Sequence, residues 1–106
     1  MYRVTTPTHT FVLPALASSY KEVQITYTQS NAFLVKHYQN ETLPSGMTFE
    51  GNKVIIRLTQ EETKRFSARK PAQVQVRVLT SDDDVYASKI FNVTIERVLN
   101  EEVLHD

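Results

Sequence analysis

Apolar and polar side chains alternate at every second position over most of this chain, and no other feature of the sequence constrains the fold as strongly. The clearest case is residues 72–80, where Val74, Val76 and Val78 are separated by polar side chains. Residues 23–28 and 53–58 show the same alternation. A period of two is typical of a strand with one buried and one solvated face, so the chain is predicted to be all-β.

Strands are expected at residues 8–13, 23–28, 32–38, 53–58, 72–80 and 85–95, with room for one short strand in the loop 41–52. Residues 72–80 are expected to be central, because β-branched side chains favour strands. Polar turns at 29–31 and 81–84 predict two hairpins. In the last segment the apolar residues Val85, Ala87 and Phe91 are spaced to share one face of the strand, but Lys89 falls on that face as well. This conflict predicts a bulge near Ser88 and Lys89.

One short helix is expected at residues 60–66. Thr59 and Glu62 fit the capping box, in which each side chain bonds the backbone N–H of the other residue. Acidic residues at its start and Lys64 and Arg65 at its end suit the helix dipole. Phe66 would attach the helix to the core.

Several short strands, turns about every 8–12 residues and a single helix in a connection indicate an antiparallel, immunoglobulin-like β-sandwich of six to seven strands. The chain has 106 residues, enough for one domain, which we place at residues 1–97. It lacks the cysteine pair and the tryptophan of antibody domains. Residues 98–106 form a tail that either docks onto a neighbouring subunit or is disordered.

Composition argues against several functions. Twelve basic and twelve acidic residues give a net charge of zero, which predicts no nucleic-acid partner and no binding to a membrane surface. No signal peptide or membrane-spanning run is apparent. The three histidines match no zinc spacing, and no phosphate loop or paired nucleophile and base can be assembled, so we expect no metal, no cofactor and no enzyme activity.

The candidate interaction residues are tyrosines outside the strand phase and apolar residues of the tail. Tyrosine is enriched at protein interfaces and stacks on sugars. The apolar residues of the tail are hard to place in a core that the strands already fill. The candidates are Tyr20, Tyr38, Tyr86, Val98, Leu99, Val103 and Leu104.

Four segments of the chain, at residues 3–11, 21–27, 54–66 and 71–80, and the tail at 99–104 carry a resemblance to a known group of proteins. The chain resembles small uncharacterised proteins encoded among the structural genes of phages and prophages of Gram-positive gut bacteria. Its layout is similar to the amino-terminal β-sandwich of phage baseplate upper proteins. The resemblance implies a component of the virion, made in the host cytoplasm, whose partners are other phage structural proteins.

Two functions stay open at this point. The first is a non-enzymatic structural module of a phage tail or baseplate, which assembles through contacts with other phage structural proteins or with copies of itself. The second is a module that binds a cell-surface glycan through exposed tyrosines such as Tyr38 and Tyr86.

Overall fold

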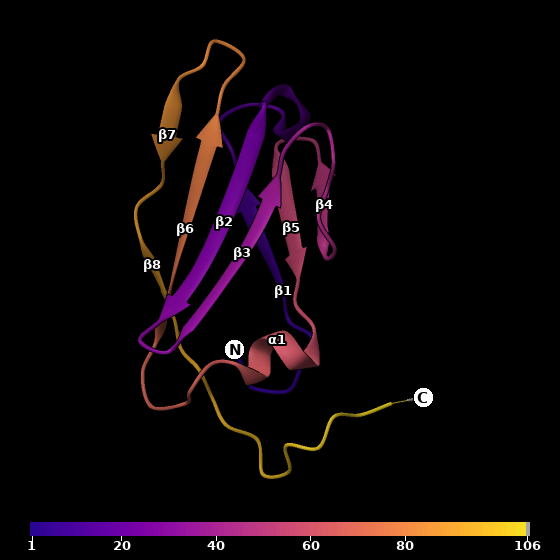
Figure 1. The fold of residues 1–106 in the computed structure, drawn as a ribbon, viewed down its shortest axis with the longest axis vertical. Helices are drawn as coiled ribbons and strands as arrows, with labels where there is room; N and C mark the ends of the chain where they lie inside the picture. Colours follow the sequence, from indigo (N-terminus) through magenta and orange to yellow (C-terminus); the bar gives the residue numbers. More distant parts are fainter. Residues whose placement is uncertain (106) are drawn as a thin grey trace.

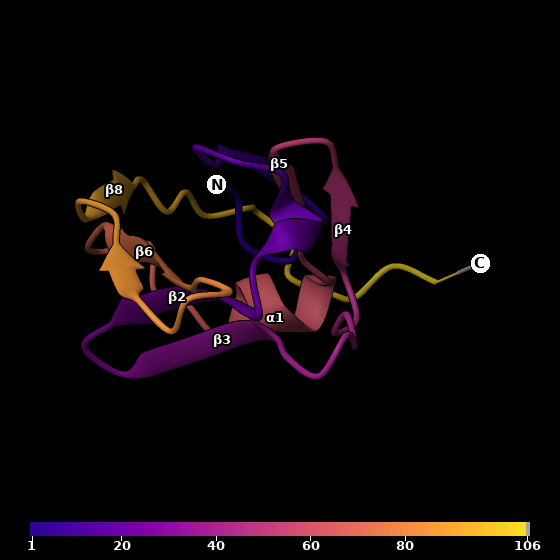
Figure 2. The same ribbon diagram turned by 90° about the horizontal axis from the view of Figure 1, so that it is seen from above.

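The computed structural model describes residues 1–105, which form two antiparallel sheets packed face to face (Figures 1 and 2). Strands account for 45% of the chain and helix for 8%, which confirms the predicted all-β sandwich. The smaller sheet has the order β1 (Thr8–Val12), β5 (Lys53–Arg57), β4 (Met47–Glu50). The larger sheet runs β3 (Ala32–Tyr38), β2 (Glu22–Gln29), β6 (Ala72–Leu79), and the far edge of β6 is shared by β7 (Val85–Ala87) and β8 (Phe91–Val93).

The core lies between the two sheets and follows the predicted alternation. In β6 the three alternating valines are at most 9% exposed, while Gln73 and Arg77 face solvent. The inward side chains of β2 are fully buried, as are Val54 and Ile56 of the opposite sheet. Since one face of each sheet packs on the other, a shift of register by one residue would expose this whole apolar set.

The predicted connections are also present. β2 and β3 form the expected hairpin, and β6 is paired on both edges, which confirms its central position. The helix α1 (Gln60–Lys64) begins at Thr59 with the full capping box, although it is shorter than the expected 60–66. A 3-10 turn, η1 (Ala17–Ser19), follows β1. Phe66, just after α1, is fully buried.

The strand count differs from the expected six or seven, because the described residues contain eight strands. β4 is the short strand for which the loop 41–52 had room. The last expected strand, 85–95, is divided into β7 and β8. Ala87 lies opposite Arg77 and Phe91 opposite Val74, so one extra residue is accommodated between the two strands, as the predicted bulge requires.

The bulge corrects the predicted phase of this segment. Tyr86, not Val85 or Ala87, lies opposite the buried Val78 and shares its inward face. Beyond the bulge Phe91 faces inward as expected. An inserted residue reverses the alternation of inward and outward side chains. Phe91 faces inward after the bulge, so Val85 and Ala87, which precede the bulge, face outward.

The two ends of the described chain lie at the end of the sandwich that carries α1 (Figure 1). The Arg3 N–H donates to the Glu96 carbonyl at 2.8 Å, and Tyr2 and Glu96 form a parallel bridge. Residues 97–105 belong to no helix or strand. None of the helices in the part of the chain that the structure describes is long and apolar enough to span a membrane.

Candidate protein-interaction cleft

The sandwich is open along one side, between the edge strand β1 of the smaller sheet and the edge strands β7 and β8 of the larger sheet. A cavity of about 680 Å³ lies there. It is bounded by the end of β1, by Tyr20, by inward residues of β6, and by residues 86–88 together with Phe91. The bridge between Tyr2 and Glu96 ties the chain together nearer α1. We call this cavity and the two strand edges beside it the open-side cleft.

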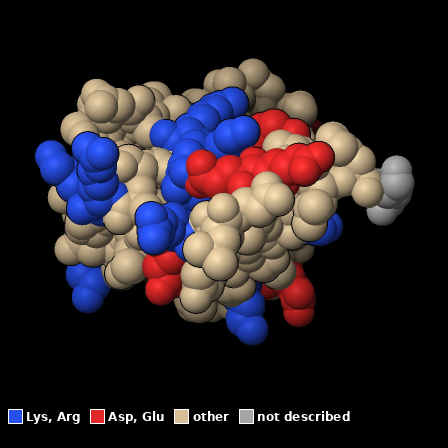
Figure 3. Space-filling view, turned by 90° about the horizontal axis from the view of Figure 1, so that it is seen from below, with Lys and Arg blue, Asp and Glu red and all other residues tan. Residues whose placement is uncertain are grey.

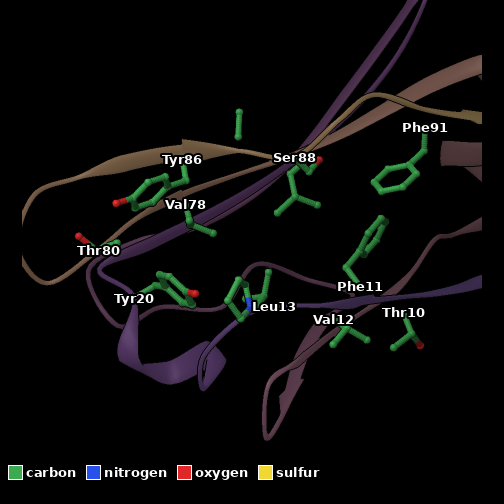
Figure 4. Close-up of a pocket in the computed structure, with 13 residues that line it drawn as sticks. Thr10, Phe11, Val12, Leu13, Tyr20, Val78, Thr80, Tyr86, Ser88 and Phe91 are labelled. Carbon is green, nitrogen blue, oxygen red and sulfur yellow. Dashed lines mark hydrogen bonds between the residues drawn. The ribbon is translucent and has the colours of Figure 1, made fainter.

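Aromatic side chains from both sheets face one another across the open-side cleft. Figure 4 shows Tyr86 and Phe91 on one side and Tyr20 and Phe11 on the other. Tyr86 is 60% exposed and Phe91 is 40% exposed, whereas Tyr20 is buried. The cleft therefore places two accessible aromatic rings above an apolar floor, which is the composition of a protein-binding surface.

Ser88 in the bulge orients these aromatic residues. Its N–H donates to the Val76 carbonyl at 2.8 Å, and its hydroxyl oxygen accepts the Val76 N–H at 3.0 Å. The side chain of Ser88 thus replaces a backbone partner where the regular ladder is interrupted. This bond keeps β7 and β8 against β6 while the extra residue reverses the alternation, so that Tyr86 and Phe91 both face the cleft.

The outer edge of β1 presents unpaired backbone groups. The Leu13 N–H donates to the carbonyl of Asn52 at 2.7 Å. The backbone N–H and C=O groups of Leu13, and of every second residue before it in β1, therefore point toward β5. In an antiparallel ladder the residues between them direct their N–H and C=O groups the other way. The backbone groups that face the open side are therefore those of Thr8, Thr10 and Val12. Among residues 1–105, β1 pairs with no strand other than β5.

The outer edge of β7 likewise pairs with no strand within residues 1–105. The Ser88 N–H bonds to Val76, so the backbone groups of Ser88 and Tyr86 point toward β6. Those of Val85 and Ala87 point away from the sheet. Both sides of the cleft are thus strand edges that could accept another strand.

Neither edge carries the charged residues or prolines that usually protect exposed strand edges. β1 contains no lysine, arginine, aspartate or glutamate, and neither do β7 and β8. The edge strand β4 differs, since it contains the exposed Glu50. Lys89 lies in the bulge between β7 and β8, and its ammonium is 5.5 Å from the centre of the Phe91 ring.

His9 is the titratable residue of β1, and it is held neutral. Its Nδ1 lies 2.7 Å from the Tyr27 hydroxyl. Burial, and secondarily the positive amino terminus, lower the pKa of His9, so its ring is neutral near pH 7 and shares a hydrogen bond with the Tyr27 hydroxyl. Burial raises the pKa of Tyr27, which remains protonated. The edge of β1 is therefore uncharged near neutral pH.

The seven predicted interaction residues have different positions. Tyr20 and Tyr38 are in the core, at 9% and 8% exposure, so the expectation that they lie free at an interface is not supported. Tyr38 packs edge-on against Phe49 with ring centres 4.8 Å apart. Tyr20 still forms part of the cleft floor, and Tyr86 is the exposed tyrosine expected from the sequence.

The apolar residues of the tail lie far from the cleft, at the α1 end. Leu99 is 98% exposed and Leu104 is 77% exposed, while Val98 and Val103 are half-buried. The backbone of Leu104 both donates to and accepts from the side chain of Gln60, each at 2.8 Å. The tail is therefore attached to α1, with its two leucines facing solvent.

A second cavity of about 680 Å³ lies at the same end and is lined by basic residues. Arg65 and Arg69, which follow α1, are joined here by Arg3 and Arg97. Arg3 is already engaged, because it pairs with Glu101 and donates to the Phe66 and Lys64 carbonyls. Figure 3 shows acidic side chains lying among the basic ones on this face. The mixed charge is typical of a solvated surface.

Sequence reasoning missed Phe11, Phe91 and Ser88 as residues of the cleft. The available signal was the bulge, which predicts that a strand edge changes direction there, but the partner edge β1 is more than seventy residues away in the chain. No group of three or more histidine, aspartate or glutamate side chains within residues 1–105 is arranged to hold a metal ion. The sequence matches no protein-family model and no curated protein.

Proposed function

We propose that this protein is a non-enzymatic interaction module of a phage virion, which assembles into a tail or baseplate through protein–protein contacts. The observation that carries the proposal is the open-side cleft, in which an apolar cavity is flanked by two uncharged, unpaired strand edges. The assignment to a virion follows the resemblance to proteins encoded among phage structural genes.

The cleft suits an extended protein segment. Strand addition gives affinity through main-chain hydrogen bonds, while alternate side chains of the incoming strand fill pockets. Thr10 and Ala87 supply unpaired main-chain groups, and Phe11 and Phe91 border the pocket between them. The two sheets already position these elements, so binding would need little rearrangement of the domain.

The cleft offers little for catalysis. Its lining residues include no aspartate, glutamate, histidine, lysine or arginine. General acid–base chemistry most often uses histidine or a carboxylate, and the lining of the cleft contains neither. These features support a binding role for the cavity.

The experiment that tests the proposal is quantitative mass spectrometry of gradient-purified particles from a phage that encodes this chain. We expect the protein to band with the major capsid protein at a fixed number of copies per particle. A phage replication protein from the same lysate serves as the control, because it should be lost on purification. If the chain were lost with the replication protein, it would not be a virion component.

Glycan binding is the second candidate, supported by the exposed rings of Tyr86 and Phe91 in one cavity. The burial of Tyr38 removes one of the two tyrosines on which that hypothesis depended. The test is calorimetric titration with host cell-wall polysaccharide, comparing the natural protein with Tyr86→Ala. Binding that Tyr86→Ala abolishes would favour the glycan function over protein assembly.

A further inference from the structure

We infer that the partner seated on the open-side cleft is a second copy of this chain, which forms a twofold dimer with open side against open side. This inference deepens the proposed function and depends on it. In such a dimer each β1 meets the β1 of the other copy, and the cleft aromatics of both copies become buried. The argument rests on the charge, the symmetry and the area of this surface.

The charge of the surface permits contact with an identical surface. β1, β7 and β8 carry no lysine, arginine, aspartate or glutamate, so strands that pair with their own copies meet no like charge, and Lys89 of the bulge lies between β7 and β8 rather than in either strand. Like charges placed opposite one another normally oppose such pairing. The whole chain also has a net charge of zero, so two copies have no overall repulsion to overcome.

The geometry of β1 also suits a twofold axis. A strand related to its own copy by a twofold axis perpendicular to the sheet runs antiparallel to it, as an antiparallel ladder requires. The outward residues of β1 are Thr8, Thr10 and Val12, with Thr10 in the middle. Pairing centred on Thr10 would place Thr8 of each copy opposite Val12 of the other and would occupy every outward group of β1.

The exposed apolar side chains of the cleft supply part of the area that a stable dimer needs. Val12, Tyr86 and Phe91 line the cleft and are between 40% and 67% exposed. Together they expose roughly 300 Å², judged from about 150–250 Å² for a whole aromatic side chain. Thr8, Thr10, Ala87 and the unpaired main chain of the two edges add to this area, toward the roughly 800 Å² per partner of a standard interface.

The test is sedimentation velocity and light scattering over a concentration series, with two disrupting variants and one matched control. Thr10→Pro removes an outward N–H of β1 without removing a bond to β5, as proline does at strand edges. Tyr86→Lys places a charge in the cleft. Phe33→Lys is the control, because Phe33 is 66% exposed on β3, the opposite edge of the larger sheet.

We expect a concentration-dependent dimer for the natural chain and for Phe33→Lys, and a dimer at least about tenfold weaker for both disrupting variants. Circular dichroism melts will show that each variant is folded. Should Thr10→Pro fail to fold, Tyr86→Lys alone decides the result, because Tyr86 is largely exposed and its replacement leaves the core intact.

Three results would overturn the inference. The natural chain could be monomeric throughout, Phe33→Lys could weaken the dimer as much as Tyr86→Lys, or deletion of residues 100–106 could abolish it. The last result would make the tail of a second copy the occupant. A strict monomer that is nevertheless found in purified particles would reject the second copy while leaving the proposed function intact.

Discussion

At the scale of single residues, a nearly buried ion pair joins α1 to the larger sheet. The Lys36 ammonium lies 2.6 Å from a Glu62 carboxylate oxygen, with side chains 9% and 12% exposed, and also donates to the Ser45 carbonyl at 2.8 Å. Burial by itself would raise the pKa of Glu62, but the hydrogen bonds and charge from Lys36 and the bonds from Thr59 lower it overall. Glu62 therefore serves the helix cap and the ion pair together.

Removing Lys36 should destabilise the fold strongly. Lys36→Met leaves the Glu62 carboxylate and the Ser45 carbonyl without their cation, and breaking one side of a buried pair costs about 3–5 kcal/mol. Urea unfolding followed by circular dichroism measures this loss. The double variant Lys36→Met with Glu62→Gln should recover part of it, since no unpaired charge remains. Equal stability of the two variants would contradict a coupled pair.

The titration of His9 should make the free energy of unfolding depend on pH below about pH 6.5. Its pKa is lowered in the folded protein from the ordinary value of 6.5, so the unfolded chain binds a proton more readily. The contribution of His9 is complete above pH 6.5 and is lost as the pH falls from there toward its folded pKa. Urea midpoints at about pH 7.5 and about pH 5.5 should differ less for His9→Gln than for the natural chain. An unchanged difference would exclude His9 as the source.

At the scale of elements, β6 organises the larger sheet. It pairs with β2 along one edge and with β7 and β8 along the other, and its inward side chains form the central part of the core. Local sequence determines this role, because alternating valines favour a strand and give it a single apolar face. The bulge opposite β6 is also local in origin, since Ser88 supplies the bond that replaces the ladder.

Val76→Asp should therefore unfold the domain. Val76 is 6% exposed in β6, and an unpaired carboxylate there would cost more than about 3 kcal/mol. Gln73→Asp is the control on the same strand, because Gln73 faces solvent and its replacement should cost less than about 1 kcal/mol. Thermal melts of the two variants provide the measurement. A Val76→Asp protein that melts cooperatively near the natural temperature would contradict the inward phase of Val76.

At the scale of the whole molecule, the sandwich is asymmetric between its sides. One side is open between β1 and β7, while β3 and β4 form the opposite edges, and β4 contains the exposed Glu50. The tail and α1 occupy one end of the long axis (Figure 1). The proposed assembly surface thus lies apart from the end of the domain that carries the tail and α1.

Amide hydrogen exchange should reveal the free edges directly. In dilute protein the outward amides of Thr10, Val12 and Ala87 should exchange rapidly, while those of Phe11 and Tyr86, which point into the sheets, should be protected. Exchange followed by NMR measures each amide separately, and neighbours on one strand are matched controls. Uniform protection along β1 would show that its outer edge is already covered.

Much of the fold could be predicted because its causes are local. The alternation in residues 72–80, the turn at 29–31 and the pair Thr59 and Glu62 each specify structure within a few residues of themselves, and all three are present as predicted. The prediction that Val85 and Ala87 face inward was wrong, because the extra residue of the predicted bulge reverses the alternation between β7 and β8. A local pattern identifies the interruption, but the backbone hydrogen bonds decide which side chains face inward afterwards.

The sequence by itself determined the class of fold, the central strand and the cap of the helix, since propensity and periodicity act over short distances. The tertiary structure alone decided that Phe11 faces Phe91, that Tyr20 and Tyr38 are buried, and that Lys36 meets Glu62. These contacts join segments from different sheets and connections. Which segments meet depends on how the sheets pair and pack, and no short stretch of sequence specifies that arrangement.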